Sequence, residues 1–190
     1  MDLPVTALYD ANVLYPAPLR DLLIRLAQAG LVRARWTEAI HDEWIQNVLQ
    51  HNPQLSSQRL TRTHRLMNEA LRDCLVTEYE DLIDSLTLPD PDDRHVLAAA
   101  IRADAEVIVT YNLKDFPAET LARFDVEAWH PDDFLLVLLD AAPSVVCAAV
   151  KRQREGLRNP PKSVEELLAT LEGQGLPQAV ARLRPFADLL

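Results

Sequence analysis

The chain has 190 residues, of which 48% are hydrophobic and 25% are charged, and its formal net charge is −10. This length suits one hydrophobic core with a small appendage, and the longest apolar runs are far shorter than the roughly 20 residues that cross a bilayer. The acid excess argues against a broadly basic nucleic-acid binder, because phosphates are drawn to Lys and Arg. We therefore expect a soluble, cytoplasmic protein that holds any polyanionic substrate by local basic patches.

The N-terminal part of the chain predicts two pairs of a strand and a helix. Residues 5–9 form an apolar run that is typical of a buried strand, and residues 18–29 carry leucines at helical spacing. Residues 31–36 predict the next strand. Thr37 is expected to cap a helix over residues 38–50.

The middle of the chain contains two segments of opposite charge. Residues 56–72 form a basic helical stretch, and residues 78–86 form a looser acidic segment. Beyond this segment, Asp90 or Asp92 is expected to cap a helix whose body is residues 96–101.

Two further strands and a helix complete an alternating pattern. Residues 105–110 contain consecutive β-branched residues, which suit a buried parallel strand, and residues 126–129 predict a last short strand before a helix over residues 131–139. Alternation of this kind favours a parallel sheet with helices on both faces. We therefore expect a three-layer α/β/α sandwich around a short parallel sheet of four to five strands.

The last part of the chain predicts a helical appendage. Residues 151–190 carry a net charge of +2, against −12 for the rest of the chain. A turn-rich break at residues 156–161 precedes a capping-box helix start at Ser163. This segment has too few leucines to form a hydrophobic core that would let it fold alone. We predict a division into a main domain of residues 1–141 and a helical extension of residues 142–190.

Four separated acidic residues fall where a parallel sheet would carry them to one edge. They are Asp10, Glu43, the cluster at residues 90–93 that includes Asp93, and Asp115. Ligands of open parallel sheets bind beyond the carboxyl ends of the strands. Carboxylates gathered there repel one another, so a divalent cation is expected as counter-charge, and hard oxygen ligands suit Mg²⁺ or Mn²⁺. Such a site suits phosphodiester hydrolysis, in which one or two ions would activate and orient water.

Each of these acids has a simpler interpretation when it is taken alone. Asp10 could cap a turn, Glu43 could lie on the surface of an amphipathic helix, and Asp115 could hold the turn before Phe116. Only their joint placement indicates a metal site.

The chain has four glycines and no glycine-rich phosphate loop, which excludes the Walker A and dinucleotide-binding motifs.

Two segments in this order resemble a known family. Residues 90–100 (DPDDRHVLAAA) and residues 107–117 (VIVTYNLKDFP), together with the opening run DANVL at residues 10–14, resemble the PIN-domain ribonucleases. Within that family the chain is similar to the VapC-like toxins of bacterial toxin–antitoxin pairs. The likeness covers about residues 5–135.

The resemblance implies roles for eight residues. Asp10, Glu43, Asp93 and Asp115 would form the catalytic and metal-binding set for Mg²⁺ or Mn²⁺, and Asn12, Asp90, Thr110 and Asn112 would support it. Asp93 is preferred to Asp90 because the alanine-rich stretch then falls at the family's spacing. Glu38 and Asp42 are neighbours of Glu43 and leave its assignment the most open.

The resemblance also implies a substrate and partners. It indicates an endoribonuclease that acts on structured RNA such as transfer RNA and is silenced by an antitoxin whose tail enters the acidic groove. Homodimerisation is a habit of the family. Our candidates for RNA contact are Arg59, Arg62, Arg65, Lys151, Arg152 and Arg154, although both basic segments could also be ordinary solvated helix faces.

Two alternatives stay open at the level of sequence. An Asp after the first strand is also the nucleophile of aspartate-dependent phosphatases, but those enzymes want a second Asp two residues later, where this chain has Asn12. The other alternative is a PIN-like scaffold without catalysis that binds RNA or protein.

Overall fold

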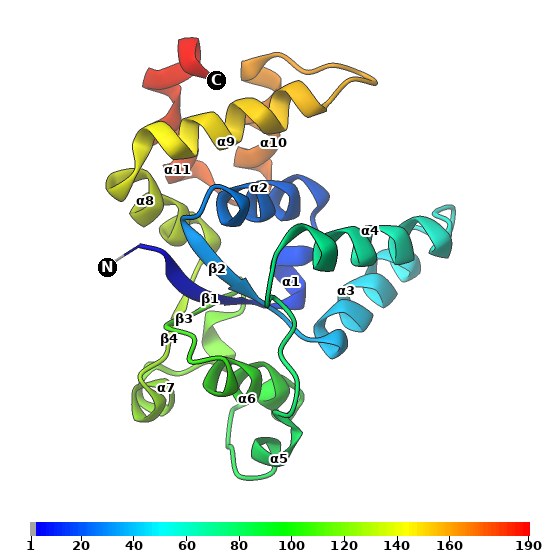
Figure 1. Cartoon of the computed structure of the whole chain (residues 1–190), viewed down its shortest axis with the longest axis vertical. Coiled ribbons are helices and arrows are strands. Elements are labelled where there is room, and N and C mark those ends of the chain that lie inside the picture. The colour runs from blue at the N-terminus through cyan, green and yellow to red at the C-terminus, as the bar shows by residue number, and fades with distance from the viewer. Residues whose placement is uncertain (1–2) are drawn as a thin grey trace.

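A four-stranded parallel sheet lies at the centre of the structure, a computed structural model that describes residues 3–190 (Figure 1). Its strands are β1 (Val5–Tyr9), β2 (Val32–Arg35), β3 (Val107–Val109) and β4 (Glu127–Trp129), in the order β2-β1-β3-β4. Every residue of β1 and β3 is buried, as expected for central strands covered on both faces. The predicted parallel α/β sheet is confirmed.

The helices follow the predicted order along the chain. They are α1 (Ala11–Leu14), α2 (Ala17–Gln28), α3 (Glu38–His51), α4 (Ser57–Ala70), α5 (Glu80–Ile83), α6 (Arg94–Arg102), α7 (Ala118–Leu121), α8 (Pro131–Ala141), α9 (Pro143–Gly156), α10 (Val164–Gly173) and α11 (Pro177–Leu183), with 3₁₀ turns at Pro91–Asp93, Leu113–Asp115, Ala122–Phe124 and Arg184–Leu189. Thr37 caps α3 as predicted, since its hydroxyl accepts the Ile40 amide.

Two local features refine the prediction. The single turn α1 was not expected, because four residues are too few to show a helical period; it starts where the Asp10 carboxylate accepts the Ala11 amide. Of the two candidate caps ahead of α6, Asp90 and not Asp92 acts as a cap. It caps the 3₁₀ turn Pro91–Asp93 that precedes the helix, since its carboxylate accepts the Asp92 amide at 2.9 Å.

Helices cover both faces of the sheet in three layers. Helices α2 and α8 lie over one face, whereas α6 and α7 lie over the other (Figure 1). The ring of Phe134 on α8 meets the ring of Tyr9 edge-on, with the centroids 6.3 Å apart. Helices α3 and α4 form a hairpin that projects beyond the sheet at the right of the view.

The C-terminal helices add an outer layer above α2 and α8. Helix α9 packs on α2, where the Gln153 side chain donates to the Pro18 carbonyl at 2.7 Å. The buried carboxylate of Asp132 on α8 accepts the amides of Gln178 and Ala179 and so caps α11. The extension thus packs on the main domain, as its leucines suggested, while the division at residue 141 stays a prediction. Within residues 3–190, no helix combines the length and hydrophobicity that a membrane crossing needs.

Candidate metal centre

Asp10 lies directly beyond the carboxyl end of β1 and is held by three donors. Its own amide still pairs with the Val109 carbonyl of β3 at 3.2 Å. The carboxylate accepts the Ala11 amide at 2.6 Å, the Asn12 side-chain amide at 2.6 Å and the Thr110 hydroxyl at 2.7 Å. Only 4% of the residue is exposed, and this burial raises its pKa although the three donors act in the opposite direction. Its orientation is therefore fixed at the edge of the sheet.

The residues expected to support the site bind one another across β1 and β3. The Asn12 side-chain amide donates to the Thr110 hydroxyl at 2.9 Å, and the Asn112 amide donates to the same oxygen at 3.0 Å. The Asn112 side chain in turn donates to Asp115. Position 12 is where an aspartate-dependent phosphatase would carry its second Asp. In this chain it is an Asn whose side chain donates a hydrogen bond to Asp10.

Three carboxylates gather next to this network. Asp90, Asp93 and Asp115 each offer an oxygen, and these oxygens all lie within 4.8 Å of one another. The Oδ2 atom of Asp93 is buried and has no hydrogen-bond partner in the protein. Burial and then the charges of Asp10, Asp90 and Asp115 raise the pKa of Asp93 to about 6. An unpaired buried oxygen among crowded carboxylates is what a hard divalent cation would satisfy, so the residues fit Mg²⁺ or Mn²⁺.

Glu43 lies at the rim of this cluster, on α3. Its side chain is 48% exposed, and partial burial followed by the charges of Asp10 and Asp93 raises its pKa to about 7. Of the two alternatives on α3, Glu38 pairs with His64 at 3.0 Å, and Asp42 is exposed, as Glu43 is. Glu43 differs from them by its approach to His95, the second residue after Asp93, at 3.8 Å. Glu43 is therefore the acid of α3 that faces the other carboxylates.

His95 is a neighbour of the site that the sequence analysis did not single out. Its Nε2 lies 3.8 Å from a carboxylate oxygen of Glu43, and its Nδ1 is buried without a hydrogen-bond partner. The signal was its place two residues after Asp93, at the start of α6, where a side chain can reach the same edge as the acid.

The two basic segments lie differently with respect to the acids. Arg59, Arg62 and Arg65 are exposed on α4, which packs against α3, the helix that carries Glu43. His64 belongs to the same stretch of sequence but turns inward, where its ring lies 4.1 Å from that of His41 and beside Glu38.

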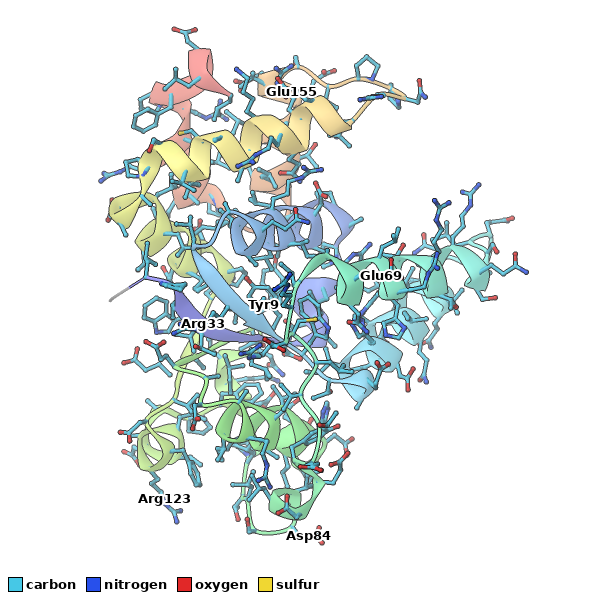
Figure 2. The ribbon with its side chains drawn as sticks, in the orientation of Figure 1. Tyr9, Arg33, Glu69, Asp84, Arg123 and Glu155 are labelled. Atoms are coloured by element: carbon cyan, nitrogen blue, oxygen red, sulfur yellow. The ribbon has the colours of Figure 1, made fainter. Side chains whose placement is uncertain are left out.

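The α9 segment is separated from the sheet by α2. Lys151 and Arg152 are exposed on α9, whereas Arg154 is half-buried and donates to the Leu190 carbonyl at 3.2 Å. In Figure 2, Glu155 at the end of this segment lies at the top of the molecule, and Tyr9, which precedes Asp10, lies at its centre. Of the two candidate segments, the one on α4 is the one that packs against the helix carrying Glu43.

The parallel sheet with acids gathered beyond its strand ends defines a PIN-type α/β/α domain. The PIN domain profile matches residues 6–114, which is more than half of the chain, so the chain belongs to the PIN-domain family. A second profile, described as the VapC50 C-terminal domain, matches residues 131–185. The resemblance to VapC-like proteins with a C-terminal extension is thereby confirmed.

A curated relative supports the same assignment. A Mycobacterium tuberculosis protein named "Putative ribonuclease VapC50" is 43% identical over 106 residues, which are 56% of this chain and 62% of the relative. The match thus spans less than two thirds of the relative's length. No solved structure matches the chain.

Proposed function

We propose that the protein is a Mg²⁺- or Mn²⁺-dependent endoribonuclease that hydrolyses RNA phosphodiester bonds, and that it is the toxin of a toxin–antitoxin pair. The observation that carries the nuclease proposal is the trio of Asp90, Asp93 and Asp115, with an unpaired buried oxygen on Asp93. Membership of the PIN family and a relative named as a ribonuclease support it.

The roles of the acids follow from how each one is held. Asp93 and Asp115 would bind the cation, and Asp90 is close enough to be a third ligand rather than a support. Asp10, fixed by its three donors, would complete the site with little reorganisation. Glu43 would close the rim from α3. A bound cation would supply positive charge and Lewis acidity at the phosphodiester group.

The α4 arginines give the proposal a place for the substrate. An acidic site repels RNA, so nearby Arg side chains are needed to hold the phosphate backbone. Arg59, Arg62 and Arg65 provide exposed charge next to the helix that carries Glu43. Structured RNA such as transfer RNA is the substrate class that we propose.

The decisive test is a pair of neighbouring substitutions. Asp93→Asn removes a proposed ligand, whereas Asp92→Asn removes an exposed carboxylate in the same turn that lies outside the trio. We expect Asp93→Asn to lower RNA cleavage by more than about a hundredfold, and Asp92→Asn to retain most of it. EDTA should abolish the wild-type reaction, and Mn²⁺ should restore it.

Four results would contradict this function. Equal cleavage by the wild type and Asp93→Asn would indicate a contaminating nuclease. Cleavage that survives EDTA would exclude a cation requirement, and a phosphoenzyme formed from small phosphate esters would favour the phosphatase. A folded wild type that binds RNA without cutting it would favour the non-catalytic module.

The toxin proposal has its own test in cells. Expression of the wild-type chain should arrest growth of a bacterial host, and the Asp93→Asn variant should not. A small protein encoded beside the gene should bind the toxin and relieve the arrest. We propose that both proteins act in the cytoplasm, where the RNA is. Arrest by both variants alike would speak against RNA cleavage as its cause. Homodimerisation remains a proposal that size-exclusion chromatography with light scattering can settle.

A further inference from the structure

Tyr111 connects the loop after β3 to the C-terminal extension. It lies between Thr110 and Asn112, and its hydroxyl donates to the main-chain carbonyl of Gln174 at 2.5 Å, a contact that bridges 63 positions of sequence. Gln174 ends α10, in the turn that leads to α11. One side chain of the acidic edge is therefore anchored outside the three layers of the main domain.

The ring of Tyr111 fits closely into this turn. Gly175 adopts φ +81°, and a Cβ atom placed there would lie 3.4 Å from a ring carbon of Tyr111. The ring also meets His130 edge-on, with the centroids 5.1 Å apart. Partial burial raises the pKa of Tyr111 to about 12, so its hydroxyl remains a donor at neutral pH.

The main chain of Tyr111 faces the proposed metal centre. Its amide donates to the Asn12 side-chain oxygen at 3.1 Å. The nitrogen of the same Asn12 amide donates to the Asp10 carboxylate at 2.6 Å. A continuous series of hydrogen bonds thus runs from Asp10 through Asn12 and Tyr111 to Gln174.

The far end of this series is itself held firmly. Asp132 on α8 accepts the amides of Gln178 and Ala179, which fixes the first turn of α11 three residues after Gly175. Leu176, which follows Gly175, is fully buried. The turn is therefore a rigid support and not a loose end of the chain.

We propose that Tyr111 is a positioning residue through which the C-terminal extension fixes the orientation of Asp10 in the metal centre. The significance of this role rests on the nuclease function proposed above. Residues that orient a metal ligand through hydrogen bonds affect metal affinity even though they do not touch the ion. The C-terminal extension then helps to orient a residue of the metal centre, in addition to packing over α2 and α8.

The test removes one hydroxyl and compares it with a distant contact of the same extension. Tyr111→Phe keeps the ring against Gly175 and loses only the hydrogen bond to Gln174. Arg182→Ala is the matched control, because it removes an exposed α11–α8 ion pair, Arg182 with Asp140 at 2.7 Å, that has no link to the β3 loop. Gly175→Ala disturbs the same contact from the side of the extension.

Two measurements on the full chain follow the effect. Calorimetric titration with Mn²⁺ should give a Kd that is about three- to tenfold weaker for Tyr111→Phe and Gly175→Ala, and unchanged for Arg182→Ala. Hydrogen exchange of the Tyr111 amide in the metal-free protein should become faster in the first two variants alone. RNA cleavage should then lose kcat at saturating RNA, with little change in KM.

The outcomes separate this inference from the function on which it rests. A folded Tyr111→Phe variant with wild-type Mn²⁺ affinity and wild-type exchange overturns the positioning role and leaves the nuclease proposal standing. A wild type that binds no Mn²⁺ overturns the metal centre, and amide exchange still decides whether Tyr111 couples the extension to Asn12. Equal losses in Arg182→Ala would reduce the effect to general stability and would also overturn it.

Discussion

At the scale of single residues, the crowded carboxylates of the site lower the free energy of unfolding of the metal-free protein. Asp93 is crowded by other carboxylates, and one of its buried oxygens has no partner. We predict that Asp93→Asn raises the free energy of unfolding in EDTA at pH 8, on the order of 1 kcal/mol after screening by solvent is allowed for. Urea denaturation measures it.

The same substitution should have the opposite sign when the cation is present. Saturating Mn²⁺ stabilises a protein that binds it in the folded state, so the wild type should then exceed Asp93→Asn in stability. Asp92→Asn, at an exposed position, serves as the control in both conditions. A metal-free Asp93→Asn protein that is less stable than the wild type would show that Asp93 has a structural role.

The raised pKa values also predict a pH dependence. Glu43 and Asp93 have pKa values of about 7 and about 6, above their ordinary values, so the folded state binds more protons than the unfolded chain between about pH 4 and pH 7. Their contribution to stability is present at low pH and is lost as the pH rises through this window.

Metal affinity should change in the other direction over the same window. Protons compete with the cation for the carboxylates, so the Mn²⁺ Kd should fall as the pH rises from 5 to 8. In Glu43→Gln the change should be nearly complete above about pH 7, one unit above the pKa of Asp93, because the group with the higher pKa is gone. Titrations at four pH values test this, and a pH-independent Kd would mean that these acids do not bind the ion.

At the scale of elements, α4 is the helix that we expect to bind RNA. Arg62→Glu should weaken binding and reduce the slope of log affinity against log salt by about one to two. Binding is measured in an Asp93→Asn background, so that the RNA is not cut. Arg152→Glu on α9 is the matched comparison, and it should leave the affinity for a short oligonucleotide unchanged.

The comparison of these two helices decides where the RNA lies. A larger loss from Arg152→Glu than from Arg62→Glu would place the RNA over α9, on the far side of α2. No loss from either would identify both basic segments as ordinary solvated surface. Sequence alone grouped the two segments as equals, because exposed charge on a helix looks the same wherever the helix packs.

Most elements could be predicted because their signals are local. The β-branched run at residues 107–109 and the Thr37 cap of α3 depend on neighbours a few positions away. The turn α1 could not be predicted, since it depends on how Asp10 leaves β1. Asp90 and Asp92 could not be ranked as caps, because both precede the helix at plausible spacing.

At the scale of the whole molecule, we expect the main domain and the extension to unfold together. Leu167, Leu168 and Leu171 of α10 are buried, and α9 covers α2. Removal of residues 142–190 would expose that surface, and we predict a loss of more than about 3 kcal/mol in the free energy of unfolding. Calorimetry of the full chain should show one transition.

A smaller deletion provides the control. Removal of residues 185–190 takes away only the final 3₁₀ segment and should cost much less than the whole extension. A chain of residues 1–141 that folds with the melting temperature of the full protein would contradict the prediction, and it would support a main domain that is independent of the extension.

The sequence by itself determined the order of strands and helices, the family and the separated acids, because periodic patterning and short motifs are written in consecutive residues. Only the tertiary structure showed that Asp90 joins Asp93 and Asp115, that His95 faces Glu43 and that His64 turns away from its basic neighbours. It also showed that Tyr111 reaches Gln174. The acceptor there is a main-chain carbonyl, which every residue carries, so no pattern of side chains could have indicated it.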